Sequence, residues 1–367
     1  MRTTLLLLGI AGAVPASAPA QDILNQPAAV VSGVMVRRYS FENGFSIHAT
    51  RQIAVPIAVV IPVSRRFQVD LGSYYVSTAV YDTSGGHGSF QGFTDTQIRG
   101  SFVFGRDAVV TTLMVNLPTG KEQTQQEFAL TSAASSNFLQ YPVNSYRNGF
   151  SVTGGVAGAI QAGAWNLGAA GSIRGSAEYT PFKDLPATKY KPGVEGRIRL
   201  GVDRLLGSSR IAAGFTFSTF SNDDIRGSTT AGQYSPGNRY IGELNLTAPV
   251  SAGSISFYLW DYYRTASVDT VIAGQTNREN VFTGGVSGAF RLGKRVSLLP
   301  LVEARFWSPD QGSGQIYGGG ATLRFDIASR LAFSPGGRYD TGKLKSGMIG
   351  SKTVKGWEAM GTLRYTF

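Results

Sequence analysis

The chain ends in the stretch Trp357-Glu-Ala-Met-Gly-Thr-Leu-Arg-Tyr-Thr-Phe367. Its odd-numbered positions are aromatic, aliphatic or glycine, and all but one of its even-numbered positions are polar. Successive side chains of a β-strand point to opposite faces of the sheet. The period-two alternation therefore predicts a strand with one apolar face and one polar face that continues to the last residue.

Three apolar residues at alternate positions close this strand: Leu363, Tyr365 and Phe367. A terminal aromatic residue with apolar residues two and four places earlier resembles the C-terminal signature of bacterial outer-membrane β-barrels. The resemblance implies that the barrel-assembly machinery reads these three residues as an assembly signal. An amphipathic strand at the end of a soluble sandwich would look similar, so the rest of the chain has to decide between the two.

The first twenty residues have the organisation of a secretory signal peptide. One early charge, Arg2, precedes a short apolar core at residues 5–10 and a run of small residues. This core is too short to span a membrane as a helix. We expect residues 1–20 to be removed after Ala18 or Ala20, and the mature protein to be exported through the inner membrane. The absence of cysteine excludes a disulfide scaffold and a lipidated cysteine.

The composition of the remaining chain favours a sheet embedded in a membrane. No later run reaches the ~18 apolar residues that a membrane helix needs. Glycine provides 47 of the 367 residues, and Phe and Tyr together provide 37. The mean hydropathy of −0.03 is expected when each strand divides its residues between two solvents. Without helices, a chain in lipid must close a sheet on itself, because its backbone groups need internal partners.

Alternating segments of about 10 to 15 residues follow one another from Val34 onward, separated in turn by short and long connections. This asymmetry is typical of outer-membrane barrels, with short periplasmic turns and long extracellular loops. The expected short connections are residues 64–66, 105–107, 161–164, 206–208, 249–253, 293–294 and 327–329. The expected long connections are residues 81–93, 118–148, 181–192, 222–236, 268–277, 308–314 and 341–353.

The predicted fold is all-β: a transmembrane antiparallel up-and-down β-barrel of about 14–16 strands. We assign it to residues 34–367, with a first hairpin that turns at Asn43 and Gly44. Residues 21–33 show no strand pattern, and we expect them to hang in the periplasm or to enter the lumen. The expected location is the bacterial outer membrane, with its lipid and lipopolysaccharide as partners.

The polar face of each strand predicts what lines the barrel, because a charge that faces lipid costs about 2 to 4 kcal/mol at mid-bilayer. Charged residues alternate with apolar ones in residues 194–203, 296–306 and 321–326. We predict a lumen that is rich in arginine, carries both signs of charge and selects solutes through the following residues: Arg99, Glu195, Arg197, Arg199, Asp203, Glu243, Arg291, Glu303, Arg305, Arg324, Asp326, Glu358 and Arg364.

These lumenal charges have two interpretations. Opposed arginines and carboxylates can set a transverse field in a water-filled pore, or they can form a paired network that fills a closed interior. A barrel of about 16 strands is too wide for side chains alone to fill, which favours the pore over a plugged barrel. The loop at residues 118–148 is the longest, and we expect it to fold inward or to form a lid.

The entrance to this loop reads Val115-Asn-Leu-Pro-Thr-Gly-Lys121, and an earlier strand begins Thr94-Asp-Thr-Gln-Ile-Arg99. These strand ends resemble those of the outer-membrane proteins grouped with phenol-degradation operons and, more distantly, of the long-chain fatty-acid transporter barrels. The resemblance covers residues 53–182 and implies diffusion of small hydrophobic or aromatic molecules across the outer membrane. The chain differs from the fatty-acid transporters because it has no long N-terminal hatch.

An enzymatic barrel needs a histidine near a serine or an acidic partner. The chain has two histidines, His48 among apolar residues and His87 in a glycine-flanked loop. We expect neither to be catalytic, and with so few candidate ligands we expect no metal and no cofactor.

Aromatic residues cluster in three of the predicted strands: Tyr258, Trp260, Tyr262, Tyr263, Phe306, Trp307 and Trp357. We assign them to the aromatic belts at the membrane interfaces. An aromatic surface inside the lumen is the alternative for residues 258–263, where both faces of the strand are aromatic.

The net charge of the chain is +11, and +10 once Arg2 is removed with the signal peptide. This balance suits an anionic surface or a pore that prefers anions, and export removes nucleic acid from the possible partners. We predict a channel for passive diffusion of small solutes. The alternatives are a gated facilitator of small hydrophobic or aromatic compounds and a non-conducting structural barrel. The oligomeric state leaves no mark in a single sequence.

Overall fold

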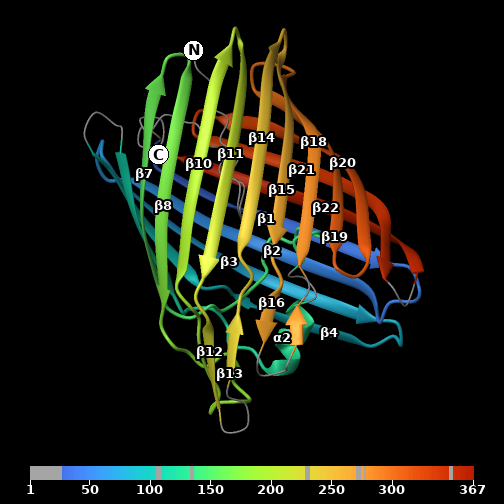
Figure 1. Cartoon of the computed structure of the whole chain (residues 1–367). Helices are drawn as coiled ribbons and strands as arrows, with labels where there is room; N and C mark the ends of the chain where they lie inside the picture. Colours follow the sequence, from blue (N-terminus) through green and yellow to red (C-terminus); the bar gives the residue numbers. More distant parts are fainter. Residues whose placement is uncertain are drawn as a thin grey trace.

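A computed structural model of the chain shows strands that pair antiparallel along the sequence until the last strand meets the first (Figure 1). The structure describes residues 27–104, 109–132, 136–227, 232–269, 274–276, 278–346 and 350–367. The predicted signal peptide lies outside the described residues, as do residues 21–26 of the predicted N-terminal segment. The closed sheet confirms the prediction of an antiparallel β-barrel.

The barrel sheet contains 17 strand segments that form 16 staves. One stave consists of β4 (His87–Phe93) and β5 (Thr96–Phe104), which both pair with β3 (Phe67–Asp82) and are separated by a break at Thr94 and Asp95. The other staves are β3 and the following strands: β1 (Ala29–Phe41), β2 (Ile47–Pro62), β6 (Val109–Leu117), β7 (Ser151–Ala162), β8 (Trp165–Ser176), β10 (Glu195–Leu206), β11 (Ser209–Phe220), β14 (Arg239–Val250), β15 (Gly253–Arg264), β18 (Glu279–Arg291), β19 (Val296–Pro309), β20 (Ser313–Ala328), β21 (Leu331–Ser346) and β22 (Gly350–Thr366).

The barrel closes where β22 pairs with β1 in an unbroken register, from Ala29 opposite Thr366 to Phe41 opposite Val354. The first strand begins at Ala29, five residues before the predicted start at Val34. Residues 29–33 have apolar residues on both faces and so show no alternation. Their backbone nevertheless pairs with both neighbouring strands, which makes them part of the sheet.

The two rims of the barrel differ as predicted, because short turns alternate with longer connections. Three of the predicted long connections were wrong, however: residues 81–93, 308–314 and 341–353 are mostly strand. On β21 and β22 the strands continue to Ser346 and from Gly350. Polar residues occupy both faces of these strand ends, so the alternation disappears while the backbone pairing continues. Long connections remain at residues 118–150, 177–194, 221–238 and 265–278.

A second, smaller sheet forms among the long connections at the loop rim, at the bottom of Figure 1. Its strands come from three different loops and pair antiparallel, which ties these loops to one another. They are β9 (Lys189–Lys191), β12 (Asp223–Arg226), β13 (Gly232–Ser235), β16 (Ser267–Asp269) and β17 (Gly274–Thr276).

The short helix α2 (Gln125–Ser132) lies in the loop between β6 and β7. A reciprocal capping box starts it: Glu127 N–H donates to the Thr124 hydroxyl (3.1 Å), and Thr124 N–H donates to the Glu127 carboxylate (2.7 Å). Desolvation opposes ionisation of Glu127, but the bonds from Thr124 and Lys183 hold its pKa below the ordinary value. In the part of the chain that the structure describes, no helix combines the length and hydropathy needed to cross a membrane.

The predicted assembly signal lies on the outer face at the turn rim, where Leu363, Tyr365 and Phe367 are 45%, 40% and 61% exposed. We expect Tyr365→Ala with Phe367→Ala to slow assembly severalfold in cells, because the assembly machinery loses two of the three residues of its predicted signal. These rings contribute little packing within the barrel, so the stability of the assembled barrel should change little. The measurement is the heat-modifiable fraction in outer-membrane extracts over time. Phe333→Ala, another outer-face aromatic of the same rim, is the control. Equal assembly rates for both variants would contradict the assignment.

Candidate functional site

Burial and exposure identify the inner face of the barrel. On β1, Arg37 and Tyr39 are buried, whereas Val34 on the alternate face is 48% exposed. On β10 and β19, Ile198 and Val302 are 56% and 65% exposed. A closed sheet exposes large aliphatic side chains in this way when its outer face lies in lipid. The polar face of each strand therefore lines the lumen.

The loop of residues 118–150 folds into the lumen, as expected, and Asp95 holds both of its ends. Asp95 is 5% exposed and lies at the break between β4 and β5. Its carboxylate accepts hydrogen bonds from the backbone N–H groups of Gly120 (2.9 Å) and Asn148 (2.7 Å) and from Asn116 Nδ2 (2.8 Å). Because the Asp95 carboxylate binds both the entrance and the exit of the loop, it fixes these two loop ends, the neck of the loop, in one geometry.

Beyond the neck, side chains of the barrel wall pair with the loop. Gln52 Nε2 donates to the Val143 carbonyl (2.8 Å), and Gln52 Oε1 accepts from the Val143 N–H (2.9 Å). The Tyr146 and Thr78 hydroxyls share a hydrogen bond of 2.9 Å. Burial raises the pKa of Tyr146 to about 12, so this phenol stays neutral at physiological pH. The wall thus supplies the partners that a sheet would otherwise give to this backbone.

A buried ion cluster lies beneath the tip of the loop. Its members are three arginines and three carboxylates: Arg37, Glu303, Arg305, Arg338, Asp340 and Glu358. Arg305 is fully buried and contacts Glu303 at 3.0 Å and Asp340 at 2.7 Å, and Arg338 bridges the same two carboxylates at 2.8 and 2.7 Å. Equal numbers of opposite charges let the cluster stay buried without an uncompensated ion.

The same arginines bind the tip of the loop through its backbone. Arg305 donates to the Phe138 carbonyl, and Arg37 donates to the carbonyls of Leu139 and Gln140. Gln140 has a φ of 52°, in the left-handed region, within the turn that presents these carbonyls. Three consecutive carbonyl groups are therefore paired with guanidinium groups of the wall. Of the predicted lining residues, Arg305 binds this loop directly, and the buried Glu303 and Glu358 pair with the arginines of the cluster.

Four aromatic residues that we assigned to the interface belts face the lumen instead: Tyr258, Trp260, Tyr262 and Trp307. Tyr262 is 8% exposed within a buried cluster against which Trp260 and Trp307 pack. Trp307 stacks on Phe138 of the loop with 5.9 Å between ring centroids. The Tyr258 hydroxyl donates to Glu303 at 2.6 Å. Residues 258–263 have aromatic side chains on both faces of the strand, so the alternation could not predict which face points into the lumen.

The aromatic residues of the outer face are consistent with a belt. Phe306 is 38% exposed, Trp357 is 44% exposed and Tyr339, one strand away from Trp357, is 54% exposed. Amphipathic rings of this kind are enriched where a barrel meets the membrane interface.

The wall formed by β8, β10, β11 and β14 carries charges that the loop does not cover. Arg197 and Arg174 both contact the buried Glu195, at 2.6 and 3.3 Å, and their side chains are 51% and 40% exposed. Arg199 pairs with Glu243 at 2.7 Å. Because these side chains point inward and still meet water, this side of the lumen contains solvent-accessible space.

The other predicted lining residues are distributed along the same inner face. Arg210, which we did not predict, pairs with Asp203 at 2.9 Å. Arg99 pairs with Asp70 at 2.5 Å, and Arg324 pairs with Asp326 at 3.0 Å. Arg364 lies opposite Ala332 of β21, and Arg291 lies opposite Ser297 of β19. The structure thus divides the predicted set into a covered group under the loop and an accessible group elsewhere.

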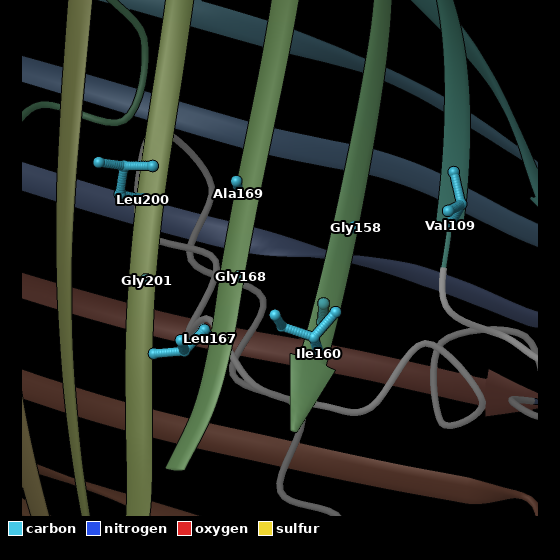
Figure 2. Close-up of a pocket in the computed structure, with 9 residues that line it drawn as sticks. Val109, Gly158, Ile160, Leu167, Gly168, Ala169, Leu200 and Gly201 are labelled. Atoms are coloured by element: carbon cyan, nitrogen blue, oxygen red, sulfur yellow. The ribbon is translucent and has the colours of Figure 1, made fainter. Parts of the chain in front are cut away.

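A shallow apolar groove lies outside the lumen, on the outer face of β6, β7, β8 and β10 (Figure 2). The aliphatic side chains of Val109, Ile160, Leu167 and Leu200 surround it, with glycine and alanine between them. Ile160 and Leu200 are 67% and 52% exposed. A groove without charged lining on this face suits acyl chains and takes no part in a path through the barrel.

Both histidines are exposed at the loop rim. His87 stacks on Tyr81 with 6.1 Å between ring centroids. Within the described ranges, no three acidic or histidine side chains are grouped so that they could hold a metal ion.

No protein-family model and no curated protein sequence matches the chain. Solved structures with a similar fold include a mutant of the TodX monoaromatic hydrocarbon channel, at 9% identity and a TM-score of 0.50, covering 96% of this chain and 93% of that one. They also include OmpT of Vibrio cholerae without its loop L8, at 9% identity and a TM-score of 0.43, covering 93% and 99%. An anion-selective porin from Comamonas acidovorans aligns at 11% identity and a TM-score of 0.41, covering 93% and 98%.

The chain has the fold of a bacterial outer-membrane β-barrel. At these identities the similarity extends to the fold alone. The loop that this barrel folds into its lumen, and the charges that hold it, are properties of its own residues.

Replacing Asp95, whose carboxylate binds both ends of the loop, tests how the loop is held. We expect Asp95→Ala to speed amide exchange in residues 137–146, because each buried N–H left unpaired costs about 1–3 kcal/mol. The measurement is hydrogen exchange by mass spectrometry. Asp310→Ala is the control, because its carboxylate is 37% exposed and pairs with Arg278 at the surface. Unchanged exchange in Asp95→Ala would show that the neck is held by other contacts.

Breaking the buried ion cluster should destabilise the barrel itself. Arg305→Met leaves carboxylates uncompensated, and we expect a loss of about 3–5 kcal/mol in the free energy of unfolding. Arg210→Met, which breaks a partly exposed pair, should cost about 0–1 kcal/mol. Urea unfolding in vesicles measures both. Adding Asp340→Asn to Arg305→Met should recover part of the loss, and a further loss would exclude charge imbalance as its cause.

Proposed function

We propose that the protein is an outer-membrane channel for passive diffusion of small solutes. The path lies between the folded loop and the wall of β8, β10, β11 and β14. The observation that carries this proposal is that Arg174 and Arg197 point into the barrel yet have side chains 40% and 51% exposed. Side chains packed in a filled interior would not meet solvent to this extent.

The charges along this path favour anions modestly. The accessible wall carries five arginines and three carboxylates, a net charge of +2, from Arg174, Arg197, Arg199, Arg210, Arg239, Glu195, Asp203 and Glu243. The covered ion cluster opposite is neutral, with three charges of each sign. An excess of guanidinium groups along one wall lowers the electrostatic barrier for anions.

Two alternatives belong to other classes. A gated facilitator of small hydrophobic or aromatic compounds is favoured by the lumenal aromatic cluster around Trp260, Tyr262 and Trp307. In this structure those rings pack against the loop, so such a role needs the loop to move. A non-conducting structural barrel is the second alternative, and it predicts no ion current.

Removing the excess positive charge of the path tests the channel. Arg197→Glu changes the net charge of the accessible wall from +2 to 0 and leaves Arg174 to pair with Glu195. We expect the anion preference in the reversal potential under a salt gradient to be lost, because mobile ions follow the fixed charge of the wall. The measurement is single-channel recording of the refolded protein in planar bilayers.

Lys343→Glu is the matched control, because it makes the same two-unit change on the outer face of β21, where Lys343 is exposed. Its reversal potential should equal that of the wild type. Silence of a folded, heat-modifiable wild-type barrel would exclude the open channel. Uptake of an aromatic hydrocarbon into vesicles by that silent barrel would then favour the gated facilitator.

A further inference from the structure

Two arginines lie side by side on the outer face of the barrel, near the loop rim. Arg38 of β1 and Arg51 of β2 are direct cross-strand partners. Their sequence neighbours Arg37 and Gln52 point inward, where they bind the loop. Since side chains of a strand alternate, Arg38 and Arg51 point away from the lumen.

This pair lies where the apolar outer surface ends. Along β2 from the turn rim toward the loop rim, the outward residues before Arg51 are all aliphatic: Ile61, Val59, Ile57, Val55 and Ile53. Ten residue steps of ~3.3 Å separate Ile61 from Arg51, about 33 Å along the strand. At a strand tilt of ~40° this is roughly 25 Å of height, comparable to the apolar band of ~25 Å of an outer-membrane barrel. The two guanidinium groups are therefore at the level of the headgroups on the side of the long loops.

An aromatic platform holds the two guanidinium groups in place. The Cζ atoms of Arg38 and Arg51 lie 5.6 and 6.0 Å from the centroid of the Tyr81 ring. Trp357, 44% exposed on the outer face, is the direct cross-strand partner of Arg38 on the other side. Cation–π contacts orient the guanidinium groups without neutralising their charge. Like charges directly opposite each other across two strands repel.

No carboxylate of the described residues neutralises this pair: neither Arg38 nor Arg51 forms an ion pair there. Arg37, the next residue along β1, is paired with Glu358 on the inner face. The nearest cation further along the outer face is Lys355 of β22, which is exposed and lies opposite Ser40. The local excess of positive charge calls for an anion from outside the chain.

We propose that Arg38 and Arg51 bind a phosphate group of a phosphorylated glycolipid in the outer leaflet, the lipid A part of lipopolysaccharide. Two adjacent guanidinium groups match the oxygens of a phosphate through bidentate, charge-assisted hydrogen bonds. The acyl chains of the same lipid extend over the aliphatic row of β2, and the rings of Tyr81 and Trp357 meet its headgroup region. This site rests on the fold and on the membrane, and does not require that the barrel conducts.

The test measures binding of defined lipids to the refolded mature protein by native mass spectrometry. Bisphosphorylated lipid A and its dephosphorylated form are titrated against the wild type and against the double variant Arg38→Gln, Arg51→Gln. We expect the double variant to bind the bisphosphorylated lipid at least about tenfold more weakly. The dephosphorylated lipid should bind both proteins equally and weakly.

The double variant Arg65→Gln, Arg66→Gln is the matched control. It removes the same two charges from the exposed turn between β2 and β3, at the opposite rim, and should bind as the wild type does. Heat-modifiable mobility verifies folding, and the single variant Arg51→Gln serves if the double variant does not fold. Equal binding by wild type and variant, or equal binding of both lipids by the wild type, would overturn the site. Displacement of the lipid by an equal concentration of inorganic phosphate would overturn recognition of the lipid.

Discussion

The structure depends on one constraint: in a membrane every backbone N–H and C=O group must find its partner within the protein. The chain meets it by pairing β22 with β1, which leaves no open edge in the barrel. Closure also forces each strand to present one face to lipid and one to the lumen. The alternation of Ile198 and Leu200 with Arg197 and Arg199 is the consequence of that division.

Within the barrel, the inward loop makes the two halves of the lumen different. On one side its backbone carbonyls are bound by Arg37 and Arg305, whose charges are balanced by buried carboxylates. On the other side Arg174 and Arg197 remain accessible to water. Residues of one chemical type thus perform two tasks. A guanidinium group stabilises the loop where backbone oxygens cover it, and in the proposed channel it shapes the field where water meets it.

The sequence predicted the barrel and the inner face of most strands, because alternation persists wherever one face meets lipid. It did not identify Asp95 or Gln52, since a single polar residue on an inward face looks the same whether it meets water or a loop backbone. It also misassigned Trp260 and Trp307, because aromatic residues are acceptable both at the membrane interface and in a covered interior.

The sequence by itself determined the closed antiparallel sheet, its approximate strand number and the charged character of its lumen. These follow from local periodicity, which each strand carries in its own residues. Only the tertiary structure decided which charges face solvent, because the loop of residues 118–150 reaches them across the barrel. It also decided that Arg38 and Arg51 share one ring of Tyr81 on the outer face. Such contacts join residues far apart in the chain, and the closed sheet and the inward loop bring them together.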